Sequence, residues 1–100
     1  MSEPELDRLR AAIERIDRAL IGLIEERVRA AHRAAEAKRS AGLPTLDPAQ
    51  EAAVIRRAAT LARDAGLPEE GVRDLFWHIV GLTRRAEQEP SATAAEQRQL

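Results

Sequence analysis

The sequence predicts an all-α fold with one long N-terminal helix and two shorter helices. Apolar residues recur in the first half of the chain at alternating steps of three and four, namely Leu6, Leu9, Ile13, Ile16, Leu20 and Leu23. This spacing is typical of a helix that packs lengthwise against other helices. Hydrophobic residues make up 44% and charged residues 33% of the chain, whereas aromatic residues make up only 2%. Such a composition is typical of a helical bundle.

The long helix is predicted to run from about Leu6 to Ser40, with Gly22 as its only interior glycine. Gly42 and Pro44 follow it, and this pair favours a helix end, since proline cannot continue the helix. A helix of thirty-odd residues is about 50 Å long, which exceeds the diameter of a hundred-residue globule. One chain therefore cannot cover its own apolar seam, and we expect a second copy to do so.

Two shorter helices are predicted in the second half. The first has Asp47 as its N-cap and Pro48 in its first turn, and Gly66 ends it. Its expected buried side consists of Val54, Ile55, Ala58, Leu61 and Ala62. The other begins at Pro68 and fades after Glu87. Its expected buried side consists of Val72, Leu75, Phe76, Ile79 and either Leu82 or Thr83.

Composition excludes several classes of function. A formal net charge of −1 gives no basic field, so we predict no nucleic-acid partner. The chain has no cysteine, and His32 and His78 have no second ligand at metal spacing, so we predict no metal and no cofactor. No apolar run reaches membrane length and the acidic start lacks signal-peptide features, so we predict a cytoplasmic protein without membrane contact. We expect residues 1–88 to form the domain and residues 89–100 a flexible C-terminal tail.

Two cations interrupt the seam of the long helix. Arg27 stands where the stepping requires a hydrophobic residue. Lys38, eleven residues later, returns to within about 20° of the same direction, about 16 Å further along. A buried cation is costly without a partner, so acidic side chains or an anionic ligand must meet these two. Arg10 precedes Arg27 by about 25 Å of helix, so a small metabolite contacts both only if one comes from the other subunit.

Five segments of the chain form an ordered set: Leu9-Arg10-x-x-Ile13-x-x-Ile16-Asp17-x-x-Leu20; Glu26-Arg27; Ala37-Lys38; Gly42-Leu43-Pro44-x-x-Asp47-Pro48-x-x-Glu51; and Leu75-Phe76-x-x-Ile79 with Thr83 and Glu87. This set resembles the all-helical chorismate mutases over about residues 6 to 88. The resemblance implies a three-helix protomer whose long N-terminal helix intertwines with that of a second copy, in a helical homodimer with two shared active sites. It also implies the dicarboxylate chorismate as substrate and its rearrangement to prephenate in the shikimate pathway, towards the aromatic amino acids. A concerted step of this kind needs restraint and charge stabilisation rather than a nucleophile or metal.

The resemblance also implies residue roles. Arg27 and, from the other subunit, Arg10 would bind the two carboxylates. Lys38 would reach a carboxylate and the ether oxygen that breaks. Asp47 and Glu51 would face the ring hydroxyl.

Thr83 and Glu87 would close the far side of the site, with Glu87 on the ether oxygen, which makes Arg27, Lys38 and Glu87 the candidate catalytic residues. An ionised Glu87 would repel the developing oxyanion, so it has to be protonated in the working enzyme. Gln50 would also touch the substrate, although the family often has arginine at this position.

Other interpretations stay open. The scaffold is similar to isochorismate pyruvate-lyases and to 4-amino-4-deoxychorismate mutases, and Gln50 could signal a changed substrate. A regulatory module activated by a shikimate-pathway partner enzyme is a second class, and a plain helical dimerisation domain is a third. Structurally, Arg27 could instead pair with Glu51 or Glu87, and Arg84 could be a solvated charge. Cations on the inward face argue against the plain dimerisation domain.

Overall fold

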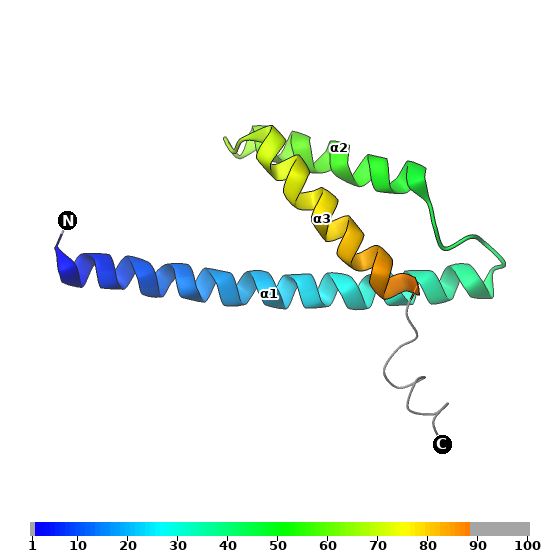
Figure 1. The fold of residues 1–100 in the computed structure, drawn as a ribbon, viewed down its shortest axis with the longest axis horizontal. Helices are drawn as coiled ribbons and strands as arrows, with labels where there is room; N and C mark the ends of the chain where they lie inside the picture. The colour runs from blue at the N-terminus through cyan, green and yellow to red at the C-terminus, as the bar shows by residue number, and fades with distance from the viewer. Residues whose placement is uncertain (1, 89–100) are drawn as a thin grey trace, which may run out of the picture.

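The computed structural model describes residues 2–88. Its secondary structure consists of the helices α1 (Glu3–Ser40), α2 (Pro48–Asp64) and α3 (Glu69–Gln88), as Figure 1 shows. The predicted all-α protomer with one long N-terminal helix is therefore confirmed. The predicted tail, residues 89–100, lies outside the described residues and stays a prediction. None of the three helices is both long and apolar enough to cross a membrane.

Local signals set both ends of α1. The Oγ of Ser2 accepts a hydrogen bond from the backbone N–H of Glu5 at 3.2 Å. At the other end, Gly42 has a φ of 72°, a left-handed conformation that favours glycine. The backbone N–H of Leu43 then donates to the carbonyl of Lys38 at 2.8 Å, which closes a Schellman motif. The chain therefore turns at Gly42, about one helical turn after Lys38, the second inward cation.

The ends of α2 follow the same rules. Asp47 is its N-cap, since Oδ1 accepts from the backbone N–H of Gln50 at 3.1 Å, and Pro48 stands in the first turn. Gly66 has a φ of 72° and the N–H of Leu67 donates to the carbonyl of Ala62 at 2.8 Å. This second Schellman turn reverses the chain into α3.

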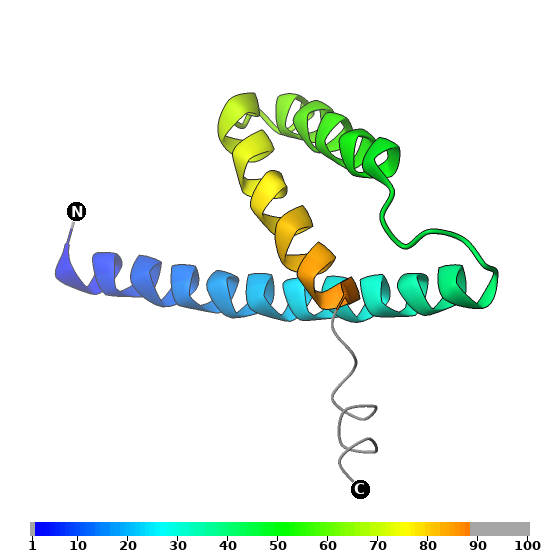
Figure 2. The ribbon, with the colours of Figure 1, turned by 45° about the vertical axis from the view of Figure 1, so that its right-hand side comes forward.

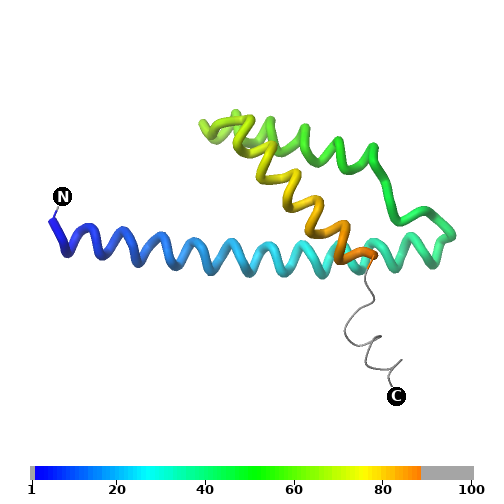
Figure 3. Tube along the Cα trace, viewed as in Figure 1, coloured from blue at the N-terminus to red at the C-terminus, as the bar shows by residue number. Residues whose placement is uncertain are grey.

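Helix α3 contacts both of the other helices. It packs against α2 as the second arm of a hairpin, and its C-terminal half crosses α1 (Figures 1 and 2). Within residues 2–88, α1 and α2 do not pack against each other. The N-terminal half of α1 extends past both other helices, as the trace in Figure 3 shows. The longest dimension is 58 Å and the radius of gyration is 17.9 Å, against about 13 Å for a compact chain of this length.

The core lies mainly between α2 and α3. Its buried apolar residues are Val54, Ile55, Ala58, Ala59, Ala62 and Val80, with Ala35 buried on α1 and Phe76 partly buried against the cluster. The predictions that Leu61 and Leu75 are buried are wrong, since both are exposed. Helix α3 instead buries a stripe through Phe76, Val80 and Thr83, which turns Leu75 away from α2.

The apolar seam of α1 is exposed in the single chain. Leu9, Ile13, Ile16, Leu20 and Leu23 each expose between 45% and 60% of their surface. Beside the last two, an apolar hollow of about 300 Å³ opens between α1 and α3; it is lined by Leu20, Leu23, Ile24, Arg27, Leu75, Phe76 and Ile79. A continuous apolar stripe of this kind typically marks an interaction surface. The intertwined homodimer remains a prediction, which these exposures favour.

Candidate active site

Six of the eight candidate site residues line one cavity of about 90 Å³. It forms where the C-terminal parts of α1 and α3 meet the N-terminus of α2 and the connection before it. The lining residues are Lys38, Thr45, Asp47, Gln50, Glu51, Val54, Val80, Thr83 and Glu87. Residues that are up to 49 positions apart in the sequence thus meet at one place. The caps of α1 and α2 fix this geometry because they set the path of the chain between Lys38 and Asp47.

Arg27 reaches the wall of this cavity from the middle of α1. Its Nη1 donates to Oγ1 of Thr83 at 3.1 Å, and that hydroxyl donates in turn to the carbonyl of Val80 at 3.0 Å. Thr83 is only 4% exposed. The structural alternative for Arg27 is corrected here, because the partner on α3 is a hydroxyl and not Glu51 or Glu87. A neutral acceptor orients the guanidinium without offsetting its charge.

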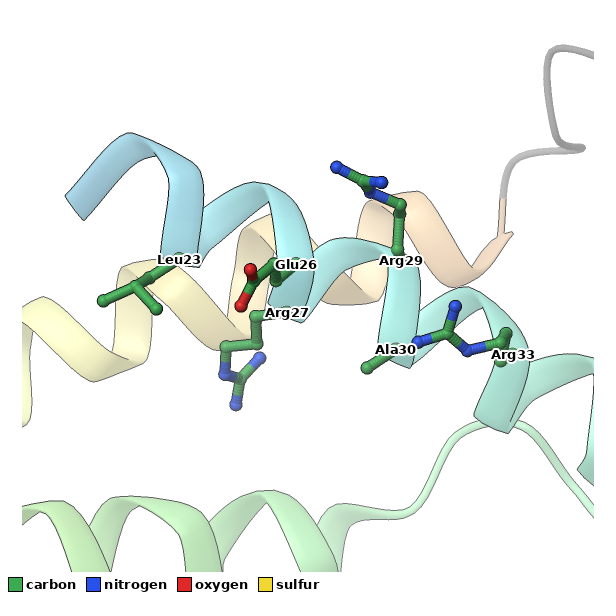
Figure 4. A pocket seen from close by; sticks show the side chains of 6 residues that line it. All are labelled: Leu23, Glu26, Arg27, Arg29, Ala30 and Arg33. Carbon is green, nitrogen blue, oxygen red and sulfur yellow. The ribbon is translucent and has the colours of Figure 1, made fainter. Parts of the chain in front are cut away.

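Arg27 also borders a second, wider hollow on α1. This hollow has a volume of about 490 Å³ and is lined by Leu23, Glu26, Arg27, Arg29, Ala30 and Arg33. In Figure 4 the side chains of Arg27 and Arg29 leave the helix in different directions. Arg29 forms an ion pair with Glu25, one turn earlier. All of these residues belong to α1, so within residues 2–88 the hollow has a wall on one helix only.

Lys38 is half-buried and lies within the cavity, as predicted from its position eleven residues after Arg27. Its Nζ donates to the backbone carbonyl of Thr45 at 3.3 Å. This acceptor is again neutral, so the ammonium group keeps its full charge towards the cavity. Two cations of one helix are therefore held by neutral groups at the same side of the fold.

The acidic residues that line the cavity are Asp47, Glu51 and Glu87. Glu51 is held by Arg84 through two hydrogen bonds, from Nε to Oε2 at 2.9 Å and from Nη2 to Oε1 at 2.7 Å. The hydrogen bond to Glu51 and then its charge raise the pKa of Arg84 above its usual value, and the charge of Glu87 adds to this. The prediction that Arg84 is a solvated charge is therefore wrong. Glu87 is half-buried, and its backbone carbonyl accepts from Nη1 of Arg39 at 3.4 Å.

Arg10 is the candidate that the single chain does not bring to the cavity. It is exposed on the N-terminal half of α1, where its Nη1 lies 3.9 Å from Oδ1 of Asp7. Seventeen residues of straight helix, about 25 Å, separate it from Arg27. A small ligand bound to Arg27 can therefore contact Arg10 only if that arginine comes from another subunit, as the sequence predicts.

Three lining residues, and Arg84 behind Glu51, were missed from the sequence. Val54 and Val80 form the apolar part of the wall, and Thr45 supplies the carbonyl that binds Lys38. Arg84 was missed although a signal exists, because it lies four residues after Val80 and three before Glu87, on the edge of the buried stripe of α3. The cavity as a whole offers a cationic donor, Lys38, with Arg27 bonded to its wall, and the carboxylate acceptors Asp47, Glu51 and Glu87. This suits a small molecule that carries both anionic and hydroxyl groups.

The fold and this cavity define a class of protein that the comparisons identify. A sequence model of the chorismate mutase type II family matches residues 9–88, and the chain belongs to this family. A relative from Streptomyces venezuelae, a 4-amino-4-deoxychorismate mutase, is 34% identical over 83 residues, which cover 83% of this chain and 81% of the relative. The resemblance drawn from the five ordered segments is therefore confirmed. Both comparisons support an isomerase of the chorismate mutase kind.

Proposed function

We propose that the protein is a chorismate mutase, which rearranges chorismate to prephenate for the biosynthesis of aromatic amino acids. This proposal rests on one observation. Lys38, Thr83, Glu87 and the acidic N-terminus of α2 line the same cavity, and Arg27 donates a hydrogen bond to Thr83 in its wall. A concerted rearrangement requires only that the substrate is folded correctly and that charge on the breaking ether oxygen is stabilised. Side chains fixed by helix packing supply both.

The charges of the cavity set the orientation of the substrate. Its two carboxylates are attracted to Lys38 and Arg27, and Arg10 of a second subunit adds a third cation. Asp47 and Glu51 repel carboxylates and accept hydrogen bonds, so they face the ring hydroxyl, which is a donor. Neutral hydrogen bonds from Gln50 replace the charge of the arginine that relatives often have there.

Lys38 and Glu87 act on the ether oxygen. The ammonium group of Lys38 stabilises the negative charge that develops as the C–O bond breaks. Glu87 donates a hydrogen bond to the same oxygen, which requires the protonated carboxylic acid. The bound dianion favours that protonated form, since an ionised carboxylate beside it would be repelled.

The charge balance favours a homodimer with shared sites. Asp47, Glu51 and Glu87 line the cavity, and the cations of the same chain that line it or bond to its lining residues are Lys38, Arg27, Arg39 and Arg84. Four cations against three carboxylates leave one positive charge, which is one fewer than a dianion needs. Arg10 of a second copy supplies the other. The exposed seam of α1 supplies the apolar surface that such a dimer would bury.

A second candidate substrate is 4-amino-4-deoxychorismate. It is favoured by the name of the 34% identical relative and by Gln50, which removes a cation from the end of the cavity where Asp47 and Glu51 lie. An ammonium group on the ring would be attracted to these carboxylates. We place chorismate first because Arg84 already neutralises Glu51.

The test is to add chorismate to the purified protein, follow its loss of absorbance and identify the product. Prephenate supports the proposal, provided that Lys38→Met abolishes the turnover and so assigns it to this cavity. Salicylate and pyruvate from isochorismate would indicate a lyase, and faster conversion of the amino compound would indicate the second candidate. Activity only after a shikimate-pathway enzyme is added would indicate a partner-activated module. The cytoplasmic location stays a prediction.

A further inference from the structure

The ion pair between Glu51 and Arg84 joins α2 to α3 at the wall of the cavity. Two parallel N–H bonds, of 2.9 and 2.7 Å, bind both carboxylate oxygens. This fork geometry fixes the orientation of a carboxylate more strictly than a single contact does. The side chains are 20% and 38% exposed, which makes this pair the most sheltered ion pair among the described residues.

Arg84 acts on any ligand through Glu51. Glu51 lines the cavity and Arg84 does not. Each carboxylate oxygen has two lone-pair directions, and Arg84 occupies one on each oxygen, so one on each remains for a ligand. The charge of Arg84 offsets that of Glu51 in this position. Asp47, in contrast, accepts from the neutral backbone N–H of Gln50 and keeps its charge.

We propose that Arg84 is a positioning residue that holds Glu51 as a charge-compensated acceptor and thereby favours a substrate ring with a neutral hydroxyl over one with an ammonium group. This inference rests on the function proposed above, which places the substituted end of the ring at Asp47 and Glu51. It assigns a role in substrate selection to a residue that does not touch the substrate.

The physical reason is the difference between a charge–charge and a charge–dipole interaction. A bare carboxylate attracts an ammonium group much more strongly than it attracts a hydroxyl group. Placing a permanent cation behind the carboxylate reduces the attraction for an ammonium group far more than that for a hydroxyl group. Arg84 therefore discriminates by repulsion against the cationic competitor as well as by orientation of the acceptor. Removing it leaves Asp47 and Glu51 both uncompensated at the same end of the cavity.

The test compares kcat/KM for chorismate and for 4-amino-4-deoxychorismate in the wild-type protein and in Arg84→Met, Arg84→Gln and Arg84→Lys. Arg84→Met keeps the apolar stem and removes the charge and both donors. We expect the ratio of kcat/KM for chorismate to kcat/KM for the amino compound to fall about tenfold or more in Arg84→Met and Arg84→Gln. Arg84→Lys should keep a ratio close to that of the wild type because the charge remains. Arg85→Met is the matched control, since Arg85 is the exposed neighbour on the same helix, and its ratio should stay within about twofold of wild type.

An unchanged ratio in folded Arg84 variants, with both substrates losing activity equally, would show that the ion pair only braces α2 against α3, and would overturn the proposal. Circular dichroism and thermal melting identify the variants that fold. If Arg84→Met does not fold, the kcat/KM ratio of Arg84→Gln tests the proposal. Failure of the wild-type protein to convert either compound would remove the proposed function and this role together. Conversion with an unmoved ratio would remove only the role of Arg84.

Discussion

Arg27 and Thr83 lie 56 residues apart, and Nη1 of the first donates to Oγ1 of the second at 3.1 Å. This hydrogen bond fixes the guanidinium of α1 against the buried face of α3, at the wall of the cavity. Because Thr83 is neutral, the contact orients Arg27 and leaves its charge for a ligand. If the residue at this position served only to stabilise the fold, an apolar side chain would be at least as stabilising as an arginine.

The first prediction concerns Arg27. Arg27→Met should lower kcat/KM for chorismate by about 10²- to 10³-fold, because a fixed charged donor to the substrate is lost. Thr83→Val should lower it by about tenfold, since the guanidinium loses its acceptor, and Thr83→Ser should restore it. Steady-state kinetics measure both effects. Arg29→Met is the control, because Arg29 is an exposed arginine on the same helix; an equal loss there would argue against a specific role for Arg27.

The second prediction concerns the shared site. Arg10→Met and Arg27→Met should each be nearly inactive, but a mixture that has been unfolded and refolded together should regain activity. In a heterodimer, one site receives both substitutions and the other receives neither. Half of the dimers are mixed and half of their sites are intact, so we expect about a quarter of the wild-type activity. A mixture no more active than its components would mean that both arginines do not serve one site across subunits.

The third prediction separates two roles of Asp47. Asp47→Asn keeps an oxygen that can cap α2, so the free energy of unfolding should change little, whereas Asp47→Ala should lower it by about 1 kcal/mol. Both variants lose the carboxylate that accepts from the ring hydroxyl, so both should lose activity. Urea unfolding and kinetics on the same samples measure the two effects. Full activity in Asp47→Asn would limit this residue to capping.

The fourth prediction concerns Glu87 as a hydrogen-bond donor to the breaking ether oxygen. Glu87→Gln keeps a neutral donor at this position, so it should retain most of the kcat/KM for chorismate. Glu87→Met removes the donor, so it should lower kcat/KM by about 10²-fold. Steady-state rates of prephenate formation measure both effects. Equal activity of Glu87→Met and the wild-type protein would contradict the role of Glu87.

The fifth prediction concerns stability at acidic pH. Nε of Arg63 donates to Glu69 across the turn between α2 and α3, and this hydrogen bond, followed by the charge of Arg63, lowers the pKa of Glu69. A depressed carboxyl pKa contributes stability above the ordinary value of about 4.3, and this contribution is lost as the pH falls through the lower pKa of the folded state. The free energies of unfolding of wild type and Glu69→Gln, measured in urea, should therefore differ most near neutral pH, and the difference should shrink as the pH falls through the lowered pKa of Glu69. NMR titration of Arg63→Gln should show the Glu69 pKa moving back up.

Features encoded in short stretches were predictable from the sequence. The helix ends follow from Asp47, Gly42 and Gly66, whose preferences act within a single turn. Lys38 was placed on the side of Arg27 by helix geometry alone. The identities of the cavity residues followed from the ordered motifs and their resemblance to a family, and the structure brings six of them together.

Features that depend on contacts between helices were not predictable. Helix α3 has two competing apolar stripes, one through Leu75 and one through Val80, and only its packing against α2 selects the second. The partners of Arg27 and Arg84 lie 56 and 33 residues away, so local patterns cannot choose among the available acceptors. The exposed seam of α1 follows the sequence period well, but no contact within residues 2–88 covers its N-terminal half.

The division of labour among the helices has a kinetic consequence. Helices α2 and α3 are neighbours in sequence and carry most of the buried residues, so this hairpin has a low contact order and should form within microseconds to milliseconds. Helix α1 buries little of its seam in the single chain, and in the proposed homodimer a second copy covers it. Refolding should therefore show a fast unimolecular gain of helix and a slower second-order recovery of enzymatic activity, whose rate rises with protein concentration.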